Sequence, residues 1–148
     1  MYKLERVYVG ETIKNFLLKD NLYKSILGVS DIEKWYPDLI TTAWFIVYND
    51  LNKIGILALK EFSNNCVEFH GGLVEASRGK DTVNILKYCL STLRVATPTI
   101  KYVTKVNSNN KPCLALLRKY GFVEKTIIKQ GYSDGDLVLL GEKDDNVL

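Results

Sequence analysis

Residues 100–124 read IKYVTKVNSNNKPCLALLRKYGFVE, and this stretch carries the pattern that decides the fold. A strand is predicted over Ile100 to Val106, with Ile100, Tyr102, Thr104 and Val106 on one face. Asn107 to Asn110 form a polar loop. Pro112 suits the first turn of a helix, and Gly121 suits the cap at its end. The stretch therefore predicts a strand, a short loop and a helix that ends at Gly121.

A second strand and helix precede this stretch. Cys66 to Glu75 form an expected strand that contains Gly71-Gly72, and such a pair indicates a bulge or the close approach of another backbone or a ligand. Gly79 to Val95 form the clearest helix. Its apolar stripe consists of Val83, Leu86, Leu90 and Leu93, joined by Cys89. Because strand–helix–strand crossovers join parallel strands, the two strands are expected to be parallel.

The flanking segments complete a mixed sheet. Further strands are expected at Leu4–Val9, Ala43–Tyr48, Lys53–Phe62, Val123–Lys129 and Leu137–Leu140. A helix is expected over Thr12–Tyr23 with Thr12 as a possible N-cap, and Ser30-Asp31-Ile32-Glu33 resembles a capping box that opens a short helix ending near Pro37. The predicted fold class is α/β (α+β), a single domain over residues 1–148 with about six or seven strands and about four helices.

The bulk composition excludes several classes of protein. With 20 basic and 17 acidic side chains and a net charge of +3, the chain has no strong nucleic-acid signal. No apolar run is long enough to span a bilayer, and the N-terminus lacks a secretory signal, so a cytoplasmic protein is expected. The three cysteines, Cys66, Cys89 and Cys113, are odd in number and widely spaced, which favours reduced thiols over disulfides or a metal site.

The two strand–helix units resemble the GNAT acyl-CoA N-acyltransferase superfamily. In that family the loop between the fourth strand and the third helix holds the CoA pyrophosphate, as Ala76-Ser77-Arg78-Gly79-Lys80 would here. A fifth strand then leads to an Asn-bearing loop and to a helix that ends in Gly-Phe, which here are Asn110 and Gly121-Phe122. The resemblance covers residues 43–140 and implies a splayed central sheet.

The resemblance also implies a reaction. An acyl group, most simply acetyl, would pass from acetyl-CoA as cosubstrate to a primary amine of a small-molecule or protein acceptor. Backbone N–H groups and the dipole at a helix N-terminus bind a pyrophosphate. The implied cofactor-binding residues are Val74, Arg78, Gly79, Lys80 and Asn110. A polar turn would account equally for Arg78-Gly79-Lys80, and a helix cap for Asn110.

Three positions depart from the family pattern. Aligned on Arg78, the two glycine positions of the pyrophosphate loop hold Asp81 and Val83. A carboxylate beside phosphates is repulsive, although acidic side chains also suit the first turn of a helix. The tyrosine that often protonates the leaving thiolate is replaced by Leu117, and Tyr120 lies one turn later.

A transferase of this type needs a base for the acceptor amine. The candidates on the relevant strand are Glu68, His70 and Glu75, and alternation places Glu68 and His70 on one face. The catalytic set is therefore Glu68, His70 and Tyr120, each of which has a structural alternative as a packed or paired side chain. No metal ligands are recognisable.

The departures leave a second reading open. The chain would then be a binding or structural module that keeps the fold and has lost the chemistry. It is similar in this respect to small divergent GNAT-like proteins encoded by tailed phages, some of which are virion-associated. A homo-oligomer or an assembly partner is compatible with either reading, since fold alone does not set function.

Overall fold

The computed structural model describes residues 1–28 and 31–143. Within them the chain forms a seven-stranded sheet in the order β1-β2-β3-β4-β5-β7-β6. The strands are β1 (Tyr2–Val7), β2 (Thr42–Asn49), β3 (Asn52–Ser63), β4 (Cys66–Leu73), β5 (Lys101–Asn107), β6 (Phe122–Tyr132) and β7 (Gly135–Glu142). The helices are α1 (Gly10–Leu17), α2 (Leu22–Leu27), α3 (Thr82–Ala96) and α4 (Lys111–Tyr120), with 3₁₀ turns at Lys19–Asn21 and Glu75–Ser77. The predicted mixed fold is confirmed.

Each face of the sheet carries its own apolar core, because side chains along a strand alternate between faces. On β2, Val47 packs into a cluster with Leu90 of α3 and Leu114 of α4. Ile46, its neighbour, packs into a second cluster with Ile13 of α1 and Leu22 of α2. Helices α3 and α4 therefore cover one face of the sheet, and α1 and α2 cover part of the other.

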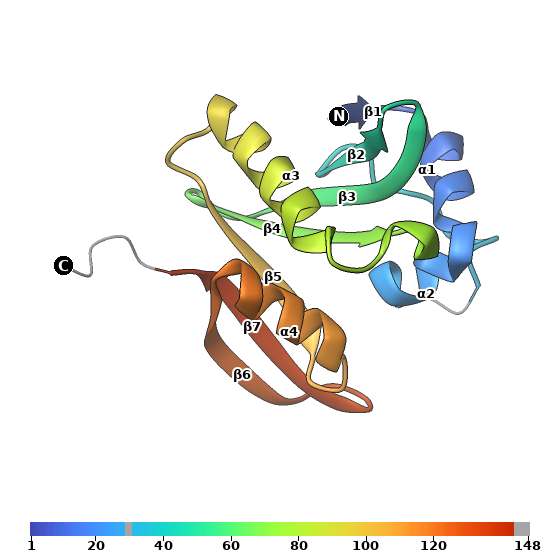
Figure 1. Cartoon of the computed structure of the whole chain (residues 1–148). Helices are drawn as coiled ribbons and strands as arrows, with labels where there is room; N and C mark the ends of the chain where they lie inside the picture. Colours follow the sequence, from blue (N-terminus) through green and yellow to red (C-terminus); the bar gives the residue numbers. More distant parts are fainter. Residues whose placement is uncertain (29–30, 144–148) are drawn as a thin grey trace.

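Strands β4 and β5 are parallel and separate along their length. Their pairing runs only from Cys66 opposite Lys101 to Glu68 opposite Val103. Beyond that point β4 still pairs with β3 as far as Leu73, while β5 pairs with β7 instead. Figure 1 shows the two strands diverging, with α3 connecting them. The expected parallel, splayed pair is confirmed.

The glycine pair of β4 is explained by packing against neighbouring elements. A Cβ on Gly71 would meet the carbonyl oxygen of Ile56 on β3 at 2.9 Å. A Cβ on Gly72 would meet the side chain of Ile26 on α2 at 3.0 Å and that of Leu22 at 3.3 Å. The close approach expected from the sequence is therefore made by a neighbouring strand on one side and by a helix on the other.

The apolar stripe of α3 is centred one position away from the predicted one. Leu90 is fully buried and Cys89 is buried, as the stripe predicts, and Ile85, which the predicted stripe omits, is buried as well. Leu86 and Leu93 are only partly buried and flank this line. Phe122 is buried in the same cluster, as expected. The helix thus meets the sheet along residues four apart, which lie one above the other on a helix.

The first predicted helix divides into two. Helix α1 begins at Gly10, so Thr12 is not the N-cap; its N–H donates to the carbonyl of Val9. Asp20 and Asn21 have φ values of 50° and 56°, and these left-handed residues break the helix before α2. The carboxylate of Asp20 accepts a 2.7 Å hydrogen bond from the N–H of Glu75. This hydrogen bond joins the turn between α1 and α2 to the segment that follows β4.

The second predicted helix, before Pro37, is wrong over the described residues 31–37, and Ser30 lies outside them. The Asp31 side chain accepts a hydrogen bond from the N–H of Glu33 at 2.9 Å. A short acidic side chain that bonds the backbone two residues on competes with helix formation. The segment is held instead by packing, since Trp35 contacts Trp44 edge to face at 5.9 Å.

Thr104 marks the point at which β4 and β5 separate. It is 4% exposed and is the one buried polar side chain among the residues that the structure describes. Its hydroxyl donates a 2.7 Å hydrogen bond to the carbonyl oxygen of Phe69, the first residue of β4 beyond the paired segment. A side-chain hydrogen bond thus replaces the next bond between the two strands.

We expect Thr104→Val to lower the free energy of unfolding by about 1–3 kcal/mol, because it leaves the buried Phe69 carbonyl without a donor. Thr104→Ser keeps the hydroxyl and loses one methyl group, which costs about 0.8 kcal/mol. Urea unfolding of both variants measures the difference. If the serine variant is the less stable one, packing of the methyl group matters more than the hydrogen bond.

Candidate functional site

The loop after β4 has the shape of a helix-terminal binding loop. Gly79 has a φ of 133°, a backbone conformation that residues other than glycine rarely adopt. Its N–H donates to the hydroxyl of Thr82 at 3.0 Å, and its carbonyl accepts from the N–H of Thr82 at 3.1 Å. The Nε of Arg78 donates to the carbonyl of Leu73 at 3.0 Å, which draws this side chain back toward β4. Val74 connects the strand to the 3₁₀ turn that precedes Arg78.

A cavity of about 300 Å³ lies beside this loop. Arg78, Lys80 and Asp81 line it from the loop, and strands β1 to β3 contribute Tyr2, Asn49 and Ile54. The two cations predicted to bind phosphate therefore share one cavity with the carboxylate that departs from the family pattern. Asp81 occupies the N-cap position of α3 but makes no capping hydrogen bond with its side chain.

Asn110 caps α4. Its side-chain oxygen accepts a 3.3 Å hydrogen bond from the N–H of Cys113, and Pro112 occupies the first turn. The cap supports the structural alternative raised by the sequence and leaves a cofactor contact untested. Because β4 and β5 are parallel, the loop after β4 and the Asn110 loop after β5 lie at the same edge of the sheet, where α/β proteins commonly bind ligands.

A set of hydrogen bonds that sequence reasoning missed ties the β5–α4 loop to the turn between β6 and β7. Asn107 donates to the Asp134 carboxylate at 2.7 Å and accepts from the N–H of Asn109 at 2.9 Å. Ser108 and Asp136 are joined by two bonds of 2.9 Å. A Cβ on Gly135 would lie 2.3 Å from the Asn107 side-chain oxygen. An Asp-Gly dipeptide such as Asp134-Gly135 is typical of a turn, but nothing in the sequence shows which loop the turn contacts.

Glu68 and His70 lie on one face of β4, as predicted, and they contact each other. Oε2 of Glu68 pairs with Nε2 of His70, and Oε1 pairs with Nζ of Lys105 at 3.1 Å. The Glu68 side chain is 12% exposed. Burial opposes its ionisation, but the hydrogen bonds from His70 and Lys105 outweigh burial and lower the pKa of Glu68. Glu68 is therefore a half-enclosed carboxylate shared by two nitrogen bases.

Lys105 is the residue of this cluster that the sequence did not single out. It lies on β5, two positions beyond Val103, the last residue paired with β4. The ring of Phe62 on β3 lies 5.8 Å from its Nζ. Val106 lies in the core covered by α3 and α4, so strand alternation predicts that Lys105 lies on the opposite face, with Glu68. The contact between Lys105 and Glu68 could not be predicted without knowing how β5 pairs with β4.

Tyr120 is separated from Glu68 and His70. Its ring stacks on Phe122 with centroids 4.9 Å apart, in the core covered by α3 and α4, so it lies on the opposite face of the sheet. It also lines a cavity of about 270 Å³ with Lys101, the first residue of β5. That cavity is at the end of β5 away from Asn110. Burial raises the pKa of Tyr120.

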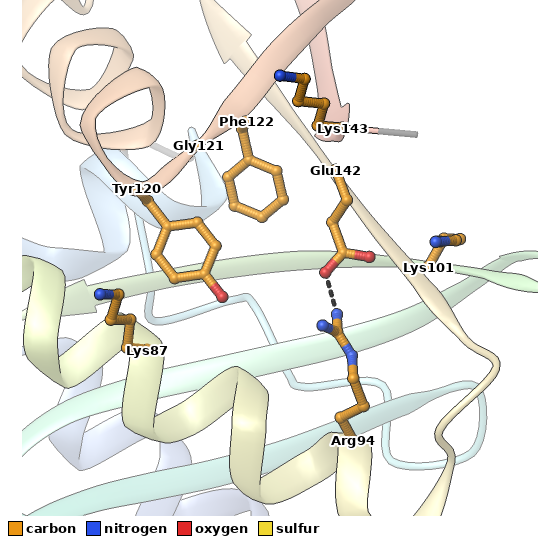
Figure 2. Close-up of a pocket in the computed structure, with 8 residues that line it drawn as sticks. All are labelled: Lys87, Arg94, Lys101, Tyr120, Gly121, Phe122, Glu142 and Lys143. Carbon is orange, nitrogen blue, oxygen red and sulfur yellow. Dashed lines mark hydrogen bonds and ion pairs between the residues drawn. The ribbon is translucent and has the colours of Figure 1, made fainter. Parts of the chain in front are cut away.

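This second cavity contains its own ion pair. Figure 2 shows Arg94 reaching from α3 to Glu142 on β7, with the ring of Tyr120 beside that of Phe122. Glu142 also accepts a 3.3 Å hydrogen bond from the N–H of Tyr102. Leu117, at the position of the family tyrosine, is buried in the core. The structure therefore brings together Glu68 and His70, and it places Tyr120 elsewhere.

The remaining chemistry-bearing groups form no site in the described ranges 1–28 and 31–143. Within them no three His, Cys, Asp or Glu side chains gather as metal ligands would. The three cysteines are free, and burial raises the pKa of Cys89 to about 12. No helix in this part of the chain is long and apolar enough to cross a membrane.

Comparison with solved structures identifies the fold. IAA acetyltransferase from Bacillus cereus ATCC 14579 aligns over 96% of this chain and 99% of its own, with a TM-score of 0.71 and 17% identity. A GNAT family acetyltransferase from Elizabethkingia anophelis with acetyl-CoA bound aligns over 97% and 98%, with a TM-score of 0.70 and 17% identity. A variant of spermidine N-acetyltransferase from Vibrio cholerae aligns over 95% and 92%, with a TM-score of 0.73 and 15% identity. No protein-family model matches the sequence, and no curated protein matches it in a sequence search.

The chain thus has the fold of the GNAT acetyltransferases, over nearly its whole length. Within that fold it keeps the separated β4–β5 pair and an Asn-to-Gly-Phe helix, and it lacks the tyrosine at position 117.

Proposed function

We propose that the protein is an N-acetyltransferase that moves an acetyl group from acetyl-CoA to a primary amine. The observation that carries this proposal is Glu68, a half-enclosed carboxylate placed where β4 and β5 begin to separate. A base at that point can serve an amine that meets a thioester lying between the strands. The solved structures of the same fold support this reading, since they include an acetyltransferase with acetyl-CoA bound and a spermidine acetyltransferase variant.

The residues present fit the cosubstrate in two respects. Beyond Glu68, the edge of β4 that faces β5 is not paired with that strand, so its backbone groups past the Phe69 carbonyl, which bonds Thr104, can bond the amides of a pantetheine arm. Arg78, Gly79 and Lys80 stand just before α3, where a helix N-terminus and two cations favour a pyrophosphate. Val74 and Asn110 would flank the arm from the ends of the two strands. The Asp81 carboxylate, which lines the same cavity, opposes binding.

The reaction removes two protons from the acceptor ammonium and supplies one to the departing thiolate. Glu68 accepts a proton from the acceptor ammonium, with His70 as the next partner in line. The neutral amine attacks the thioester carbonyl, the C–N bond forms, and the C–S bond breaks. The attacking nitrogen then loses its second proton. Because Leu117 has no proton to donate and Tyr120 lies on the other face, this proton reaches the departing thiolate through water. No covalent enzyme intermediate is required.

The activity is tested by following free thiol while the full chain is incubated with acetyl-CoA and a panel of primary amines. The panel would contain spermidine, paromomycin and peptides with a free N-terminus. Amine-dependent thiol release supports the proposal. If the chain binds acetyl-CoA but no amine of the panel causes thiol release, the result favours a binding module that keeps the fold without the chemistry.

We expect changes in the loop before α3 to shift acetyl-CoA affinity in opposite directions. Arg78→Ala should weaken binding, and high salt should do the same, because the pairing is largely electrostatic. Asp81→Asn should tighten binding by roughly fivefold, since like charges about 4 Å apart in water cost about 1 kcal/mol. Calorimetry measures both dissociation constants.

Arg118→Ala is the matched control for this experiment. Arg118 is on α4, paired with Glu124 and remote in sequence from the loop. If all three variants bind acetyl-CoA equally, the pyrophosphate does not lie against Arg78 and Asp81.

A further inference from the structure

We propose that Lys105 is a self-acetylation site, modified by acetyl-CoA bound between β4 and β5. This inference rests on the proposed function and adds a modification site to it. Its starting point is that an amine of the chain itself already lies in hydrogen-bond contact with the proposed base, since Lys105 Nζ is 3.1 Å from Oε1 of Glu68.

The position of Lys105 along β5 places it close to where β4 and β5 separate. Pairing of β4 with β5 ends at Glu68 and Val103, and the hydroxyl of Thr104 then bonds the Phe69 carbonyl on the face covered by α3 and α4. Lys105 is the next residue and lies on the other face. Its amine therefore lies beside the point where the strands separate, the same place at which an acceptor amine would have to meet a thioester.

The surroundings of the Lys105 amine would allow it to lose a proton. The Lys105 side chain is 37% exposed, so solvent still reaches it. Glu68 contacts it from β4, and the ring of Phe62 lies 5.8 Å from Nζ on β3. Both carboxylate oxygens of Glu68 have a nitrogen partner, Lys105 on one and His70 on the other. An amine, a carboxylate and an imidazole thus form a line along which a proton can leave the amine.

The chemistry balances with acetyl-CoA as the only co-reactant. The Lys105 ammonium gives one proton to Glu68, and the neutral amine attacks the thioester carbonyl carbon. The C–N bond forms, the C–S bond breaks, and the second proton of the attacking nitrogen passes through water to the thiolate, which leaves as free CoA. The product is an acetylated Lys105 amide, which has lost its charge and can no longer form an ion pair with Glu68.

The chain offers a matched control lysine. Lys3 on β1 lies 3.1 Å from Oε2 of Glu5, the same distance as in the Lys105 pair, and its side chain is 66% exposed. Strand β1 is at the edge of the sheet, three strands from β4. Acetylation that needs only an accessible lysine beside a carboxylate would modify Lys3 faster than Lys105.

The test is incubation of the full chain with acetyl-CoA, followed by intact mass measurement and peptide mapping. We expect one acetyl group, on Lys105, to form at least tenfold faster than any on Lys3. Lys105→Arg, which keeps the charge, should abolish that product. Glu68→Gln should slow it about 100-fold, the lower range for a general base.

Three outcomes overturn the inference, and the first two differ in what they say of the proposed function. If the chain binds acetyl-CoA and acetylates added amines while Lys105 is modified no faster than Lys3, only the inference fails. If the chain binds no acetyl-CoA in calorimetry and Lys105 stays unmodified, both fail. Modification of Lys105 at an unchanged rate in Glu68→Gln also contradicts it, because the base would then play no part.

Discussion

Glu68→Gln lowers the rate of amine-dependent thiol release by at least about 100-fold, if Glu68 is the general base of the proposed reaction. Glutamine has the same shape but accepts no proton. It also loses the charge that pairs with His70 and Lys105. The acetyl-CoA dissociation constant should change little, because the implied pyrophosphate contacts lie in the loop before α3. The expected loss is therefore in turnover rather than in binding.

Folding must be checked beside the rate in this experiment. The pKa of Glu68 is lowered in the folded chain, so its pairing contributes stability above the pKa of an unfolded glutamate, and this contribution is lost as the pH falls through the folded pKa. Glu68→Gln should therefore unfold somewhat more easily at neutral pH. An unchanged rate in a folded variant would mean that Glu68 is a paired structural carboxylate and that the base is elsewhere.

Leu90→Ala lowers the free energy of unfolding by about 2–5 kcal/mol, the usual cost of a large cavity in a packed core. Leu90 is fully buried between α3 and the sheet, in the same cluster as Phe122. Chemical denaturation at constant pH measures the change.

Leu93→Ala is the matched control on the same helix. Leu93 is only partly buried, so its loss should cost clearly less than that of Leu90. Equal effects of the two variants would mean that Leu93 packs as deeply against the sheet as Leu90 does.

The strand–helix units could be predicted because their signals are local. Alternation in Ile100–Val106, Pro112 at a helix start and Gly121 at its end each follow from short-range rules, and β5 and α4 lie within a residue of those limits. The crossover then required β4 and β5 to be parallel. Their separation followed from the resemblance to the family, not from any residue pattern.

The N-terminal helices were predicted less well because side chains compete with the backbone there. Asp31 bonds the N–H of Glu33 and so opposes the helix that the capping-box pattern suggests. Asp20 takes a left-handed conformation and bonds Glu75, a residue far away in the sequence. Neither outcome is visible in apolar periodicity.

The candidate site, too, was predicted only where the signal is local. Alternation along β4 predicted that Glu68 and His70 share a face. The contact with Lys105 depends on how β5 lies against β4, and the separation of Tyr120 depends on which face α4 covers. Such relations between distant segments need the three-dimensional pairing of strands.

The central claim is that this fold binds acetyl-CoA between β4 and β5 and beside the loop before α3. Calorimetric titration of the native chain and of an Asp81→Gly, Val83→Gly variant with acetyl-CoA tests it most directly. The account predicts saturable binding by the native chain, tighter binding by the variant, and a loss of helix stability of about 0.5–1 kcal/mol for each glycine. Absence of binding in both chains, with both shown to be folded, would contradict it.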